Sequence, residues 1–209
     1  TFVTPDGRYA VGGMIGASEI IAIDTETDEV MFEMSIPYSQ NPFVGGVRPL
    51  TFTVNEDGST RSMLVNVGGW HGFWEFDWET QELMNKVSPP DGSWERMDQT
   101  ADGIQSAPSH GVVVLPDQSQ VWHSSRATSH IYGYSFPDYD YLGRVYIGNP
   151  AWITTTPDSK FLWVGVSGHN ETAVVDVEKQ EVIKRFPVGQ APKRIFTAIM
   201  PSDWEGEAP

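Results

Sequence analysis

TTPDSKFLWVGVSGHNETAVVDVEKQEVIKRFPVGQAPKRI, residues 155–195, decides the fold because its spacing recurs three more times in the chain. Asp158 lies in a turn motif after a proline, and Asp176 follows 18 residues later, at the end of an apolar run. The corresponding pairs are Asp6 and Asp24, Asp57 and Asp77, and Asp117 and Ser135, which are 18, 20 and 18 residues apart. Four copies of one internal spacing indicate a repeat.

Each unit contains four short β-rich segments. In the last unit, Phe161–Val166, Thr172–Val177 and Val182–Phe186 follow a Pro-Asp turn, and in another unit Leu50–Val54 precedes the turn. Pro, Asp and Gly suit such turns because of their backbone preferences. No segment shows the 3.6-residue apolar period of a helix. Four-stranded units of about 40 to 50 residues are typical of propeller blades, so the sequence predicts an all-β protein, a β-propeller of four-stranded antiparallel blades.

The framework of the units resembles the YVTN-type propeller repeat of bacteria and archaea. That repeat has a Pro-Asp-Gly turn, a Tyr-Val-Thr-Asn-like second strand, a Val-Ile-Asp third strand and an Ile-x-Val-Gly-x-x-Pro end. Here the second-strand motif reads LWVGV, MLVNV, QVWHS and YAVGG, so the likeness lies in the framework. It covers nearly the whole chain. The resemblance implies the fold and no particular activity, because such propellers serve many roles.

We expect one propeller domain over residues 1–200, with blades at about 1–37, 48–88, 109–147 and 151–188. Residues 193–200 form an isolated first strand, and residues 201–209 are expected to be a flexible tail. Because a propeller closes its ring by strand pairing, we expect 193–200 to be a closing strand of a blade whose other strands lie upstream of Thr1. The parent protein would then have about seven blades.

The amino-acid composition argues against two classes of binding partner. The chain has 13 basic and 28 acidic residues, a net charge of −15, which argues against nucleic acid and anionic membranes as partners. No apolar run is long enough for membrane insertion. The absence of cysteine excludes disulfides and thiolate chemistry, and it fits an oxidising compartment, so we expect a periplasmic or extracellular location.

The repeat also assigns loops to faces. The starts of the first strands and the loops between second and third strands emerge on one face, here called the mouth face, and the Asp turns emerge on the other. All five histidines are expected on the mouth face: His71, His110, His123, His130 and His169. The aspartates that precede the fourth strands are expected to hold the turns by bonding backbone groups, namely Asp24, Asp77 and Asp176. A longer connection, Ser88–Pro108, is either a binding-face insertion or a packed loop anchored by Trp94.

Two sets of candidate site residues follow from this arrangement. The starts of the first strands would bring cations, an imidazole and an aromatic ring to the mouth of the central channel, and these suit an anionic or carboxylate-bearing small molecule. The predicted ligand contacts are Arg48, His110, Arg126, Trp152, Lys193 and Arg194. The rival is a metal site for copper or another transition metal, assembled across blades from His71, His110 and His169.

Three functions remain open from the sequence. The leading hypothesis is an exported propeller that binds a small molecule or protein partner through its mouth face. The second is an enzyme, either a copper- or haem-assisted redox propeller or a lactonase-like hydrolase. The third is a scaffold that self-associates. Common signatures of hydrolases, phosphate-binding loops and dinucleotide-binding folds do not occur in the sequence.

Overall fold

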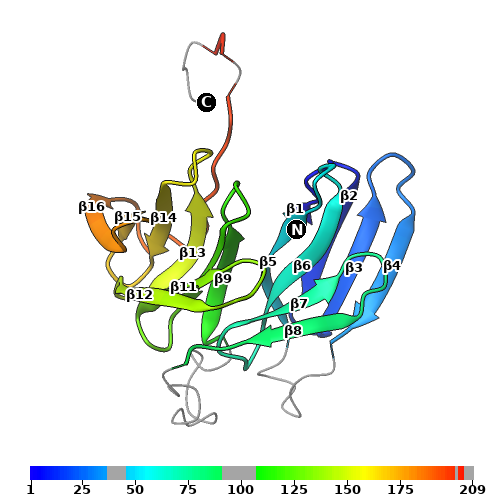
Figure 1. The fold of residues 1–209 in the computed structure, drawn as a ribbon, viewed down its shortest axis with the longest axis horizontal. Helices are drawn as coiled ribbons and strands as arrows, with labels where there is room; N and C mark the ends of the chain where they lie inside the picture. Colours follow the sequence, from blue (N-terminus) through cyan, green and yellow to red (C-terminus); the bar gives the residue numbers. More distant parts are fainter. Residues whose placement is uncertain (37–45, 91–106, 201, 205–209) are drawn as a thin grey trace.

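The computed structural model describes residues 1–36, 46–90, 107–200 and 202–204. Their regular elements are β-strands, arranged in four antiparallel four-stranded sheets (Figure 1). Among these described residues, no helix is long and apolar enough to cross a membrane. The predicted all-β propeller architecture is therefore confirmed.

Each sheet is one blade, and its strands pair in chain order. Blade 1 contains β1 (Phe2–Val3), β2 (Tyr9–Met14), β3 (Glu19–Asp24) and β4 (Val30–Ser35). Blade 2 contains β5 (Val47–Val54), β6 (Thr60–Val67), β7 (Phe73–Asp77) and β8 (Leu83–Val87). Blade 3 contains β9 (Ser109–Val114), β10 (Gln120–Ser125), β11 (His130–Ser135) and β12 (Tyr141–Tyr146). Blade 4 contains β13 (Pro150–Thr155), β14 (Phe161–Val166), β15 (Glu171–Asp176) and β16 (Glu181–Pro187).

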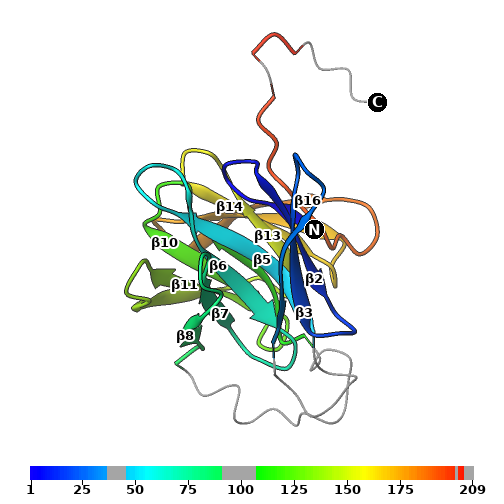
Figure 2. The same ribbon diagram turned by 90° about the vertical axis from the view of Figure 1, so that its right-hand side faces the viewer.

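The first strands form the inner wall of the molecule. β5 packs beside β9, and β9 packs beside β13, while β2 also contacts β5. Within each blade the strands then pair in order outward from this wall, so that the fourth strand lies farthest from it, as Figures 1 and 2 show. Residues at the same position of each first strand therefore lie close together, although 41 to 62 residues separate the starts of successive first strands in the sequence.

The apolar cores lie between neighbouring blades. Trp78 of blade 2 packs against Tyr9 and Phe32 of blade 1, with ring centroids 5.5 and 5.4 Å away. Phe73 of blade 2 packs against Tyr134 of blade 3 at 5.8 Å. The third core joins blades 3 and 4 through Trp122, Ile131, Val145, Ile153, Val164 and Val175, among others. Burial of both sheet faces explains the nearly continuous apolar runs of the second and third strands.

The prediction for the turn aspartates is confirmed. The Asp24 carboxylate accepts hydrogen bonds from the backbone N–H groups of Glu26 and Thr27, at 2.9 and 3.1 Å. Asp77 accepts the equivalent pair from Glu79 and Thr80 at 3.0 and 2.9 Å. The third aspartate, Asp176, accepts one from the backbone of Lys179 at 2.9 Å. The hydrogen bond from the Arg8 side chain is the main cause of the lowered pKa of Asp24, and the backbone contacts add to it. The backbone contacts are the main cause of the lowered pKa values of Asp77 and Asp176.

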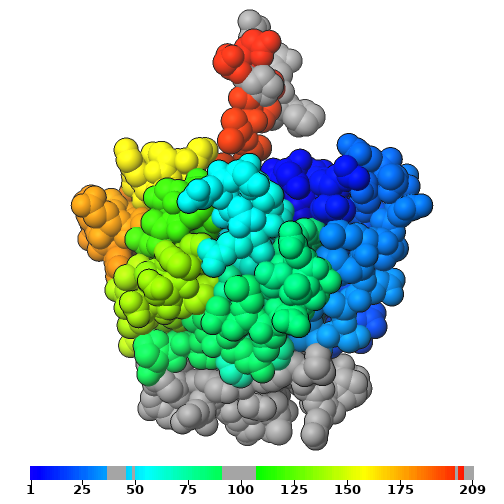
Figure 3. Space-filling model, turned by 45° about the vertical axis from the view of Figure 1, so that its right-hand side comes forward, coloured from blue at the N-terminus to red at the C-terminus, as the bar shows by residue number. Residues whose placement is uncertain are grey.

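The segment expected to be a closing strand forms no strand here. Residues 193–200 run beside β13, and Thr197 bonds Thr154 and the backbone carbonyl of Thr155 through its hydroxyl group. A strand needs a neighbouring ladder of backbone groups, and no described segment pairs with residues 193–200 in this way. Phe196 and Ile199 remain 62% and 83% exposed, and the end of the segment stands out from the body of the molecule (Figure 3).

Most of the predicted insertion at Ser88–Pro108 lies outside the described residues, because only Ser88–Pro90, Ala107 and Pro108 are described. Trp94 and the tail at 205–209 also lie outside them.

Candidate functional site

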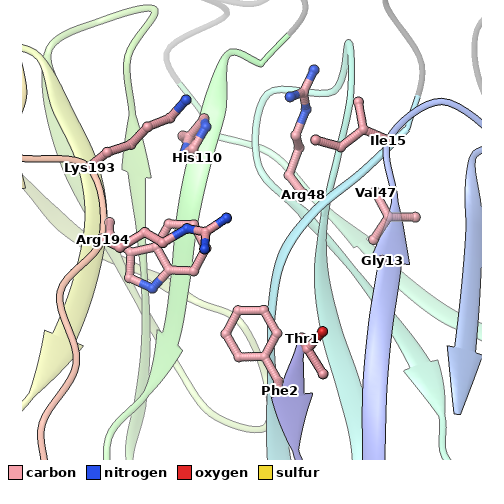
Figure 4. Close-up of a pocket in the computed structure, with 10 residues that line it drawn as sticks. Thr1, Phe2, Gly13, Ile15, Val47, Arg48, His110, Lys193 and Arg194 are labelled. Atoms are coloured by element: carbon pink, nitrogen blue, oxygen red, sulfur yellow. The ribbon is translucent and has the colours of Figure 1, made fainter. Parts of the chain in front are cut away.

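A cavity of about 170 Å³ lies where the inner strands of all four blades face one another (Figure 4). We call it the channel-mouth cavity. Its lining residues are Thr1, Phe2, Gly13, Ile15, Val47, Arg48, His110, Trp152, Lys193 and Arg194. Five of the six predicted ligand contacts are therefore brought together: Arg48, His110, Trp152, Lys193 and Arg194.

Three of these side chains converge because they occupy matching positions in successive repeats. Arg48, His110 and Trp152 are the second or third residues of β5, β9 and β13. Since β9 lies beside both other strands, the repeat itself brings the three side chains to one wall. The repeat in the sequence thus determines which side chains meet at this wall of the cavity.

Lys193 and Arg194 reach the cavity on the segment that follows β16. The Val188 N–H and the Ala191 N–H donate to the backbone oxygen and side-chain oxygen of Asn170, at 2.9 and 2.8 Å. The Ser167 hydroxyl donates to the carbonyl of Pro192 at 2.7 Å. These bonds hold the segment against the loop between β14 and β15. The Arg194 guanidinium then lies 5.7 Å from the centre of the Trp152 ring, within the range of a cation–π contact.

His110 is the most buried polar side chain of the cavity. It is 5% exposed, and its Nδ1 atom has no hydrogen-bond partner among the described residues. Burial, together with the charges of Arg126, Lys193 and Arg48, lowers the pKa of His110 to about 4. The imidazole is therefore neutral near pH 7. It presents a hydrogen-bonding nitrogen to the cavity rather than a positive charge.

The positive charge of the cavity comes from Arg48, Lys193 and Arg194. Burial and the neighbouring charge of Arg126 lower the pKa of Arg48, which still keeps its proton because an arginine starts from so high a value. Lys193 and Arg194 are exposed. The described residues that line the cavity include no Asp or Glu. The local charge is thus opposite in sign to the net charge of the chain.

Arg126 does not line the cavity, contrary to the prediction. Its Nε–H donates to the side-chain oxygen of Asn149 at 3.4 Å, and its backbone N–H donates to Pro108. Arg126 lies in the loop after β10, one strand farther from the channel than the first strands. It acts on Arg48 and His110 through its charge alone.

The sequence reasoning missed the apolar part of the cavity. Phe2 stacks on Trp152 with ring centroids 5.8 Å apart and planes 6° apart, and Phe196 packs edge-on against Trp152 at 5.8 Å. Val47 and Ile15 complete this part of the lining. Their positions carried a signal, because Val47 begins a first strand and Ile15 begins a loop between second and third strands. Of the apolar lining residues, only Trp152 was among the predicted contacts.

The proposed metal site at His71, His110 and His169 is not assembled. The described residues, which include all three histidines, contain no group of three His, Asp or Glu side chains placed to hold a metal ion. His71 is fully buried in the loop after β6, and its Nε2 lies 2.7 Å from the Ser125 hydroxyl of blade 3. His169 is exposed and packs over Gly148, in the connection between β12 and β13.

The other two histidines flank the loop between β10 and β11, as the sequence predicted. His123 is fully buried in β10, and its ring stacks on Tyr132 and Tyr134 at 5.2 and 5.8 Å. Its Nδ1 lies 3.3 Å from the Ser109 hydroxyl. His130, at the start of β11, contacts the backbone oxygen of Thr128 through Nδ1. The imidazoles of His71 and His123 therefore belong to the interface of blades 2 and 3, and only His110 faces the cavity.

Comparison with known proteins supports the fold alone. No protein-family model matches the chain, and no curated protein matches it. Among solved structures, hydrazine synthase of Kuenenia stuttgartiensis superposes with a TM-score of 0.63 over 88% of this chain, at 14% sequence identity. This chain spans 47% of the length of that chain. At such low identity the likeness shows a common propeller architecture and transfers no activity.

Proposed function

We propose that this protein is a propeller that binds a small anionic ligand in the channel-mouth cavity. The observation that carries the proposal is the convergence of Arg48, Lys193 and Arg194 with the buried His110 around one cavity that no described acidic side chain lines. Arginine binds carboxylates through two parallel hydrogen bonds, and lysine adds a point charge. A neutral imidazole supplies one further hydrogen bond.

The net charge of −15 repels anions at long range. Beyond about 8 Å, salt at physiological concentration screens this repulsion. Contacts inside the cavity then decide whether an anion binds. The metal-dependent enzyme required His71, His110 and His169 to converge, so we do not carry that alternative forward.

The test is a titration of the purified protein with sodium acetate, sulfate and benzoate at constant ionic strength, followed by thermal unfolding and calorimetry. We expect at least one anion to raise the melting temperature. Arg48→Ala should weaken its binding about tenfold or more, because a hydrogen bond to a charged group contributes about 1.5 to 3 kcal/mol.

Lys160→Ala is the matched control, because it also removes one positive charge. Lys160 lies beside Asp158, in the turn between β13 and β14, on the opposite face. We expect this variant to bind as the wild type does. Equal losses in both variants would mean that general charge explains the binding, and no response to any of the three anions would contradict the proposal.

We further propose that the protein is exported. The support is its acidity and the absence of cysteine from all 209 residues, which suits an oxidising compartment. Fractionation of cells that produce the tagged full-length protein checks this. Recovery of the protein only from the cytoplasm would rule out export.

A further inference from the structure

The channel-mouth cavity has two chemically different ends. In Figure 4 the nitrogen-bearing ends of Lys193, His110 and Arg48 lie in the upper half of the view, and Phe2 lies in the lower half. Arg194 lies between them, over the ring of Trp152. A ligand that fills the whole cavity therefore meets polar nitrogens at one end and hydrocarbon at the other.

The apolar end is a wall of the cavity rather than part of a sealed core. Phe2 and Trp152 are only partly buried, even though their rings stack on each other. An apolar group placed against them would remove part of their exposed surface from water, which favours binding.

The polar end suits a carboxylate in particular. The guanidinium of Arg48 and the ammonium of Lys193 neutralise the charge of such a group. The neutral imidazole of His110 lines the same end and can add one hydrogen bond.

The volume of the channel-mouth cavity limits the size of the apolar part of the ligand. A cavity of about 150 Å³ with an apolar lining accommodates a benzene ring. The channel-mouth cavity has about 170 Å³ and is partly open. It therefore suits one ring or a short branched chain together with a carboxylate, whereas a bare inorganic anion would leave the apolar end filled with water.

From these observations, and resting on the proposed function, we propose that the ligand is a compact carboxylate with an apolar body, such as an aryl carboxylate. Its carboxylate is held by Arg48, His110 and Lys193, and its apolar body lies against Phe2 and Trp152.

The experiment compares benzoate, cyclohexanecarboxylate, acetate and sulfate by calorimetry at constant ionic strength. We expect the two ring-bearing carboxylates to bind at least tenfold more tightly than acetate and sulfate.

Phe2→Ala tests the apolar end of the cavity, and Phe186→Ala is its control. Phe186 is also a partly buried aromatic residue, but it stacks on Trp163 in the outer part of blade 4, with centroids 5.6 Å apart. Phe2→Ala should lower benzoate affinity about tenfold, and Phe186→Ala should not change it. If acetate or sulfate binds as tightly as benzoate, the proposal of an aryl carboxylate as the ligand is wrong, whereas the proposed anion-binding function is supported. If no anion binds at all, both the aryl carboxylate proposal and the proposed function are wrong.

Discussion

The free energy of unfolding should fall by about 3 kcal/mol between pH 6.5 and pH 4 through the protonation of His110. The pKa of His110 is about 4 in the folded protein and 6.5 when the imidazole is free in water. In this window the unfolded state binds the proton that the folded state excludes, so stability rises with pH. Each pH unit between the two values corresponds to about 1.4 kcal/mol. The stabilisation is complete above pH 6.5 and is lost as the pH falls to about 4.

Urea unfolding at several pH values, followed by tryptophan fluorescence, measures this slope. His110→Gln removes the titrating group, and the difference in slope between this variant and the wild type isolates the contribution of His110. The turn aspartates titrate in a separate window, because their pKa values lie below 3.8 and their stabilising contribution disappears only in more acidic solution. Equal slopes for the wild type and His110→Gln would contradict the burial of a neutral imidazole.

Gly72→Ala should lower the free energy of unfolding by about 3 kcal/mol or more. Gly72 has φ +131°, a backbone conformation that other residues adopt at a cost of about 1 to 3 kcal/mol. A Cβ atom there would also collide with the backbone carbonyl of Val87. The backbone of Gly72 is fixed on both sides: its N–H donates to Ser109 of blade 3, and its carbonyl accepts from Asn66, each at 2.8 Å. The chain therefore cannot move away without losing buried hydrogen bonds.

Gly58→Ala is the matched control. Gly58 also has a positive φ, +85°, but no atom other than its chain neighbours lies within 4 Å of the position that its Cβ would take. This variant should lose only about 1 kcal/mol, through backbone strain. Thermal unfolding separates the two, because 1 kcal/mol corresponds to about 2 to 4 °C in a protein of this size. Similar melting temperatures for Gly72→Ala and Gly58→Ala would show that the Val87 contact does not matter.

The sequence predicted the part of the structure that depends on repetition. Asp24, Asp77 and Asp176 mark the same turn in three blades, and the shared spacing leads directly to four strands for each blade. The same reasoning placed Arg48 and His110 at matching positions, so their meeting in one cavity followed from the repeat.

Contacts between blades could not be predicted in this way. The spacing within a unit does not tell which side chain of the next blade it meets, so the contact of His71 with Ser125 was not foreseen. Phe2 and Ile15 were missed because an apolar residue at a loop carries no chemical signal of its own. Residues 193–200 can form a strand only where a neighbouring strand pairs with them, and their own sequence does not show whether such a neighbour is present.

The location of the apolar cores between the blades has a thermodynamic consequence. A blade on its own would expose both faces of a sheet, so its stability comes from its neighbours rather than from itself. The chain then behaves as a row of coupled units, in which the free energy of each unit depends on the units on either side. Damage at one junction, such as the packing of Phe73 on Tyr134, therefore weakens blades 2 and 3 first and reaches the outer blades only through them.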